Sequence, residues 1–136
     1  MPPGTVITFA GATAPTGYLA CDGSDVSRVT YPDLYTAIAD TYGAGDGAST
    51  FGLPDLRGEF VRGVDGGRGV DSGRALGSFQ ADEIKAHTHS GTSGDAGTTS
   101  VGGGDRDTDD ASYTTDSTGG VETRPRNVAL LYCIKS

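Results

Sequence analysis

The stretch from residue 90 to residue 120 carries almost no apolar side chains, and this limits what the chain can fold into. Its only members of the apolar set are Ala96, Val101, Ala111 and Tyr113. Six aspartates against the single Arg106 leave this stretch with a net charge of -5. Such a composition cannot offset its ordering entropy by burial within one chain. We therefore expect either a flexible loop or a segment that something outside the chain orders.

Ordered elements are predicted on both sides of this stretch. A helix is expected to begin at Pro32, to place Leu34 and Ile38 on one apolar face and to end at Gly43. Apolar, β-rich runs predict strands at residues 6–10, 18–21 and 128–134, with a further strand candidate at residues 59–63. The chain is thus predicted to leave a turn-rich domain over residues 1–85, to make a polar excursion over residues 86–121 and to return with residues 122–136. The expected class is α+β, mostly β and irregular.

Charge and hydropathy exclude two classes of partner. The net charge of -8 and the sequence pI of about 4.4 give a surface that repels phosphate backbones, so nucleic acid is not an expected partner. No apolar run approaches the roughly 18 residues of a membrane span, so membrane insertion is not expected. The two cysteines, Cys21 and Cys133, fit buried thiols in a reducing compartment, although a disulfide between the chain ends stays open.

His87 and His89 are the chain's two histidines, and they lie at the start of the polar excursion. In an extended strand they would project to the same face, because the side-chain period is two. Two imidazoles make a poor metal site, but three chains on a threefold axis would offer six nitrogens. Octahedral coordination favours Fe(II), with Zn(II) as the alternative. The pair is therefore either accidental surface polarity or the metal site of a homotrimer that shares one ion.

Two other motifs predict no site. The acidic run from Asp105 to Asp110 resembles a calcium loop, but it has Asp110 where an EF-hand requires glycine and has no flanking apolar helices. Residues 63–69 are rich in glycine but lack the strand and lysine of a phosphate-binding loop. We interpret the first as solvated charge and the second as a turn-rich connector.

Several motifs, in order along the chain, resemble the phage tail-collar domain family. The resemblance covers roughly residues 3–63 and 122–135, and it rests on PGTVITFAG at 3–11, APTGYLACDG at 14–23, YPDLY at 31–35, TFGLPDLRG at 50–58 and RPRNVAL at 124–130. It implies the receptor-binding tip of a tail fibre, from a phage or a related tail-like bacteriocin. In long and short tail fibres of this kind, a collar sits on an intertwined homotrimer whose H-x-H strands bind iron or zinc. Only His87 and His89 match that pattern here, which implies one ion per trimer.

Under this resemblance, residues 1–85 form the collar and the excursion forms an extended, metal-bound tip that contacts the host. Hydroxyl, amide and carboxylate groups suit sugar hydroxyls, and one aromatic ring suits a sugar face. Three identical tips would multiply weak contacts. The expected partners are the rest of the fibre and a bacterial lipopolysaccharide, capsule or outer-membrane protein, and assembly is expected in the host cytoplasm. The expected receptor contacts are Asp105, Arg106, Asp107, Asp109 and Tyr113.

Two other functions compete with adhesion. A polysaccharide depolymerase would need two carboxylates about 5–10 Å apart on a rigid scaffold, and the available acidic residues lie in the glycine-rich stretch, so we expect no enzyme. A structural collar without receptor contact is the remaining alternative. Deleting residues 91–120 would separate it from an adhesin.

Overall fold

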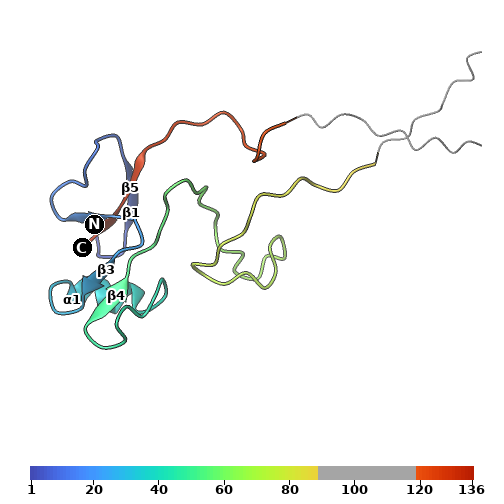
Figure 1. Cartoon of the computed structure of the whole chain (residues 1–136). Coiled ribbons are helices and arrows are strands. Elements are labelled where there is room, and N and C mark those ends of the chain that lie inside the picture. Colours follow the sequence, from blue (N-terminus) through green and yellow to red (C-terminus); the bar gives the residue numbers. More distant parts are fainter. Residues whose placement is uncertain (89–118) are drawn as a thin grey trace, which may run out of the picture. The chain divides into compact units, whose positions relative to one another are not determined.

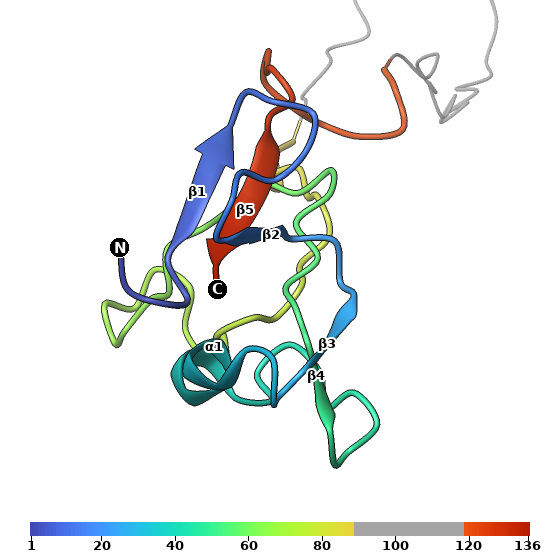
Figure 2. The same cartoon turned by 90° about the vertical axis from the view of Figure 1, so that its left-hand side faces the viewer.

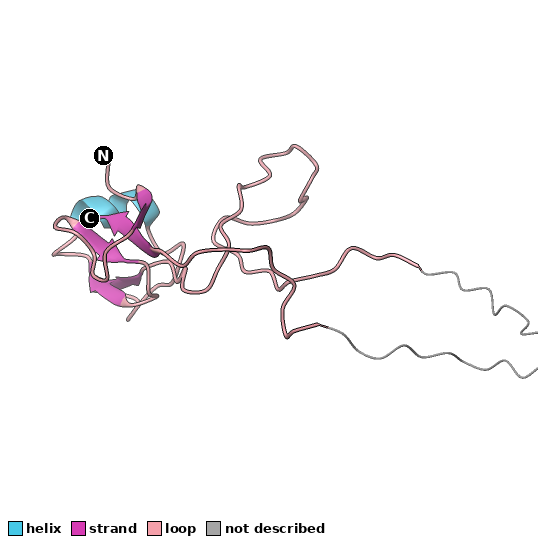
Figure 3. Cartoon of the chain, turned by 90° about the horizontal axis from the view of Figure 1, so that it is seen from above, coloured by secondary structure: helices cyan, strands magenta, loops and turns pink. Residues whose placement is uncertain are grey.

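The computed structural model describes residues 1–88 and 119–136 (Figure 1). The chain divides into two compact units. We call residues 1–80 with 126–136 the core unit and residues 81–125 the excursion unit. All helices and strands of the described residues belong to the core unit, and the rest is loop (Figure 3). Within these described ranges, no helix is long and apolar enough to cross a bilayer.

A three-stranded antiparallel sheet joins the two ends of the chain. It consists of β1 (Val6–Phe9), β2 (Tyr18–Ala20) and β5 (Leu131–Lys135), in the order β1-β5-β2. The last strand therefore lies between the first two (Figure 2). The strands predicted at residues 6–10 and 18–21 are confirmed. The strand predicted at 128–134 begins only at Leu131, and Val128 is 84% exposed.

A two-stranded ribbon and one helix complete the core unit. Strands β3 (Asp25–Ser27) and β4 (Thr50–Gly52) pair antiparallel, with Val26 opposite Phe51. Sequence patterning missed both strands, because aspartate, serine and glycine are poor strand formers. Helix α1 (Pro32–Ile38) begins at the predicted residue. Its predicted end at Gly43 is wrong, because Ala39 adopts φ +47° and breaks the helix four residues earlier.

The buried core is small. It comprises Cys21, Leu34, Phe51, Leu53 and Ile134, with half-buried side chains from the helix and both sheets packed around it. Leu34 carries the buried face of α1 and is fully buried. The ring centres of Tyr35 and Phe51 lie 5.2 Å apart, and the rings are tilted to each other, which is a favourable arrangement for an aromatic pair. The helix therefore packs on the core through Leu34 and on the β3–β4 ribbon through the contact between Tyr35 and Phe51.

The chain from residue 53 to residue 88 contains no helix or strand. The strand expected at residues 59–63 is therefore wrong. Phe60 and Val61 are both more than half exposed, and no described strand pairs with them. A β-rich run forms a strand only where a neighbouring backbone is present to pair with it.

Candidate functional site

The two ends of the excursion unit meet through one hydrogen bond. The backbone N–H of Thr123 donates to Oδ2 of Asp82 at 3.0 Å, across 41 residues of chain. Beyond Thr123 the chain enters the core unit as β5, whose register places Leu131 opposite Phe9. The polar excursion is therefore fixed at both ends, and its return strand is the middle strand of a sheet.

His87 lies on the outgoing arm of the excursion. It is exposed, and its Nδ1 lies 3.1 Å from the carbonyl oxygen of Lys85. Residues 81–88 form no strand, so His87 does not lie on the strand that was expected to carry both histidines. His89 lies outside the described residues. Among residues 1–88 and 119–136 no three histidine, cysteine or carboxylate side chains cluster as metal ligands.

The other predicted site residues lie outside the described residues. They are His89, Asp105, Arg106, Asp107, Asp109 and Tyr113. The metal site and the receptor contacts both stay predictions.

Arg28 is the main polar tie of the core unit, and sequence reasoning missed it. Its Nε donates to the carbonyl oxygen of Thr50 at 2.8 Å, and its Nη2 donates to Oδ1 of Asp40 at 3.0 Å and to the carbonyl oxygen of Ala44 at 3.3 Å. Its guanidinium carbon lies 4.4 Å from the centre of the Tyr35 ring. One side chain thus connects β4, the helix and the turn that follows it. No local sequence pattern marks this role, because its partners lie up to 22 residues away.

Residues 62–73 contain a tandem repeat that our interpretation of residues 63–69 as a simple connector overlooked. The sequence RGVDGG at 62–67 is followed directly by RGVDSG at 68–73 and then by Arg74. The two aspartates have different roles. Asp65 accepts hydrogen bonds from the N–H groups of Gly69, Val70 and Asp71 at 2.7–2.9 Å, and these bonds lower the pKa of its carboxyl. The Asp65 side chain of the first repeat therefore holds the backbone of the second repeat close to the first.

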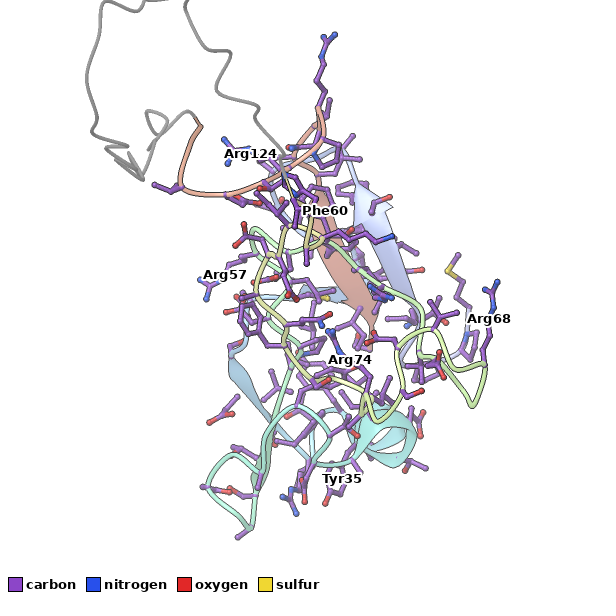
Figure 4. The ribbon with its side chains drawn as sticks, turned by 90° about the vertical axis from the view of Figure 1, so that its right-hand side faces the viewer. Tyr35, Arg57, Phe60, Arg68, Arg74 and Arg124 are labelled. Atoms are coloured by element: carbon purple, nitrogen blue, oxygen red, sulfur yellow. The ribbon has the colours of Figure 1, made fainter. Side chains whose placement is uncertain are left out.

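The aspartate of the second repeat binds arginines instead. Oδ2 of Asp71 lies 3.0 Å from Nε of Arg62 and 3.7 Å from Nη1 of Arg74. These contacts are ion pairs, not aligned hydrogen bonds. Arg74 also donates to Oγ and to the carbonyl oxygen of Ser78. In Figure 4, Arg74 lies over the middle of the unit, whereas Arg68 extends away from it.

The repeat segment borders a groove of about 600 Å³ within the core unit. Its lining includes the apolar residues Phe60, Leu76 and Phe79, together with Tyr42 and residues 53–56. Gly77 passes close to Tyr42: an added Cβ would lie 3.1 Å from the Tyr42 ring, and φ is +77°. The groove is therefore lined by apolar side chains from both segments, with Asp71 and Arg74 beside them.

Two further features are structural. The guanidinium of Arg57 holds the pKa of Asp55 at about 2 through hydrogen bonds of 2.8 Å and 2.6 Å.

Cys21 and Cys133 are both free and buried. Burial raises the pKa of both thiols, that of Cys21 to about 11. The nearby Cys133 also raises the pKa of Cys21. Both thiols are free in the structure, so no disulfide joins the two ends of the chain.

Comparison with known proteins tests the sequence resemblance. Residues 4–61 match the family model of the Phage Tail Collar Domain. The chain is 37% identical over 89 residues to StfE of Escherichia coli (strain K12), and 32% identical over 143 residues to RhiB of Rhizobium leguminosarum bv. viciae. It is 29% identical over 159 residues to a protein of Haemophilus phage HP1 (strain HP1c1) named "Probable tail fiber protein".

These alignments cover 65%, 88% and 98% of this chain but 44%, 64% and 16% of the respective relatives. The chain thus spans less than two thirds of the length of each. The matched model includes the ribbon, the helix and two strands of the larger sheet, and it ends one residue before the tandem repeat. The sequence resemblance is confirmed, and the chain carries a phage tail collar domain over residues 4–61.

Proposed function

We propose that this chain is the receptor-binding tip of a tail fibre, on a phage or a tail-like particle. The observation that carries the proposal is the position of β5 between β1 and β2. Because the chain returns into the middle of the sheet, residues 81–125 form a closed excursion with both ends anchored. Loops held at both ends by a rigid scaffold are common carriers of binding residues.

In this proposal the collar joins the rest of the fibre, and the excursion contacts a lipopolysaccharide, capsule or outer-membrane protein. Three chains associate, and together their His87 and His89 side chains hold a single Fe(II) ion per trimer, with Zn(II) as the alternative. His87 fits such a role because it is exposed on the outgoing arm. Imidazole nitrogens suit either metal. The ion would add to folding free energy by fixing three polar segments at one point.

The host-contacting residues in this proposal are Asp105, Arg106, Asp107, Asp109 and Tyr113. In this proposal their role is to bind the receptor and not to catalyse a reaction. The site of action is the distal end of the virion tail, after assembly in the host cytoplasm.

The test is binding of the labelled full chain to host cells. A variant lacking residues 91–120 should lose binding, whereas Arg68→Ala, an exposed substitution in the core unit, should bind as wild type does. Equal cell binding by the deletion variant would favour a purely structural collar. Release of new reducing ends from host polysaccharide would instead show a depolymerase.

The metal is tested on the same preparation. Elemental analysis should find about one iron or zinc per three chains, and a metal-free trimer would contradict the proposed ion.

A further inference from the structure

The groove of the core unit combines aromatic side chains with hydrogen-bonding ones. Its volume of about 600 Å³ lies within the range of about 300–1,000 Å³ that is typical of small-molecule sites. The aromatic members of its lining are Tyr42, Phe60 and Phe79. The polar members include Asp55, Glu59, Arg62, Asp71, Arg74 and Gln80. The groove therefore offers ring faces and hydrogen-bonding groups to the same ligand.

The two phenylalanine rings of the lining are accessible. Phe60 is 59% and Phe79 is 74% exposed, whereas Leu53 and Pro54 of the same lining are buried. Solvent therefore reaches both rings although they border a groove. An accessible ring face can cover the C–H face of a sugar ring, because both surfaces are apolar.

Several polar groups of the lining are held in place by one another. Oδ2 of Asp71 forms ion pairs with Nε of Arg62 at 3.0 Å and with Nη1 of Arg74 at 3.7 Å. Nη1 of Arg74 also donates to Oε1 of Gln80. These contacts exist without a ligand, so less conformational entropy is lost when a ligand binds to the groups.

Arg62 keeps donors for a ligand. Its side chain is 53% exposed, and it contacts Asp71 through Nε. A guanidinium carries five N–H donors, most of them on its two terminal nitrogens. In the part of the chain that the structure describes, the ion pair with Asp71 thus leaves the terminal N–H groups of Arg62 for ligand oxygens.

The charges of the groove favour a neutral ligand. Its charged lining residues are Asp55, Glu59, Arg62, Asp71 and Arg74. Because Arg57 binds Asp55, three carboxylates are matched by three guanidiniums. An anion would meet guanidiniums that are already paired, and the chain's net charge of -8 would repel it. An apolar ligand would remove water from paired charges and give no hydrogen bonds in return. Hydroxyl groups on a neutral ligand avoid both costs.

We propose that this groove binds a neutral oligosaccharide, with Phe60 and Phe79 against sugar rings and Arg62 donating to sugar hydroxyls. The inference deepens the proposed function and rests on it for one point, that the particle recognises a saccharide on the cell surface. It adds a contact site that the core unit builds without residues 91–120. Two weak sites on one chain raise the overall avidity for a repeating surface polymer.

The test titrates the full chain with defined probes and follows amide resonances by NMR. The neutral probes are maltotriose, cellotriose, mannotriose and galactotriose; trigalacturonic acid is the acidic counterpart of the last, and trileucine is an apolar peptide. At least one neutral trisaccharide should bind with a dissociation constant on the order of 1 mM or lower. It should shift the amide resonances of residues 53–80 and leave those of residues 44–48 unchanged. This measurement on wild type does not depend on any variant.

Variants then test the rings. Phe79→Ala should weaken binding of that trisaccharide at least about tenfold, because a stacking face is lost, and Phe79→Tyr should stay within about threefold of wild type. Val29→Ala is the control, since Val29 is 87% exposed and does not line the groove. It should bind as wild type does.

Three results would overturn the proposal. They are the failure of every neutral trisaccharide at about 10 mM to shift residues 53–80, binding that is unchanged in Phe79→Ala, and tighter binding of trigalacturonic acid or trileucine than of any neutral probe. The proposed function fails separately. If cell binding survives deletion of residues 91–120 while the trisaccharide still shifts the groove, the excursion is not the receptor contact and this inference stands. If the deletion abolishes cell binding and no neutral sugar reaches the groove, the reverse holds.

Discussion

Replacing Arg28 with alanine removes the side chain that ties three parts of the core unit together. Its guanidinium is one fifth exposed, and it donates to two backbone carbonyl groups and to the Asp40 carboxylate. A hydrogen bond to a charged group contributes about 1.5–3 kcal/mol, and a cation–π contact with a tyrosine contributes about 0.5–1 kcal/mol. The ion pair adds little, because the Asp40 side chain is 46% exposed. Since these contributions are not additive, we expect a loss of about 2–4 kcal/mol.

For a unit of this size, 1 kcal/mol shifts the melting temperature by about 4–8 °C, so the variant should melt at least about 8 °C below wild type. The assay is urea and thermal unfolding followed by far-ultraviolet circular dichroism, at one fixed protein concentration because the chain is proposed to associate. Arg28→Lys keeps the charge but not the forked donors, so it should recover less than half of the loss. Arg68→Ala should stay within about 0.5 kcal/mol of wild type, as exposed substitutions usually do. A loss below 1 kcal/mol for Arg28→Ala would refute the reasoning.

Three other substitutions test separate parts of the molecule. Leu34→Ala should cost about 2–5 kcal/mol in urea unfolding, because Leu34 is fully buried and the helix has no other buried residue; a cost under 1 kcal/mol would show that the helix is not held by the core. The Asp55 carboxyl has its pKa lowered to about 2 by Arg57, so its stabilising effect is full above about pH 4 and is lost as pH falls toward 2. The difference in urea midpoint between wild type and Asp55→Asn should accordingly disappear over that range, and a difference independent of pH would contradict the pairing. His87→Ala combined with His89→Ala should lower the melting temperature of the assembly by as much as a chelator lowers that of wild type, and an unchanged melting profile would exclude a structural ion.

The sequence by itself determined the local features whose causes lie within a few residues. Apolar runs located β1, β2 and the end of the chain that becomes β5, and Pro32 marked the start of α1. The polar composition after residue 90 predicts an excursion that one chain cannot bury, and most of that stretch lies outside the described residues. The collar motifs were also readable, because they are contiguous stretches.

Only the tertiary structure decided the features that depend on distant partners. The position of β5 between β1 and β2 requires pairing across more than a hundred residues, and no local pattern encodes it. Arg28 acquires its role from Thr50 and Asp40, which folding brings within hydrogen-bond distance. The same holds for residues 59–63, whose β-rich side chains form no strand because no strand of the described residues pairs with them. Side-chain identity sets local preference, but pairing and burial depend on which segments meet, and that is a property of the whole chain.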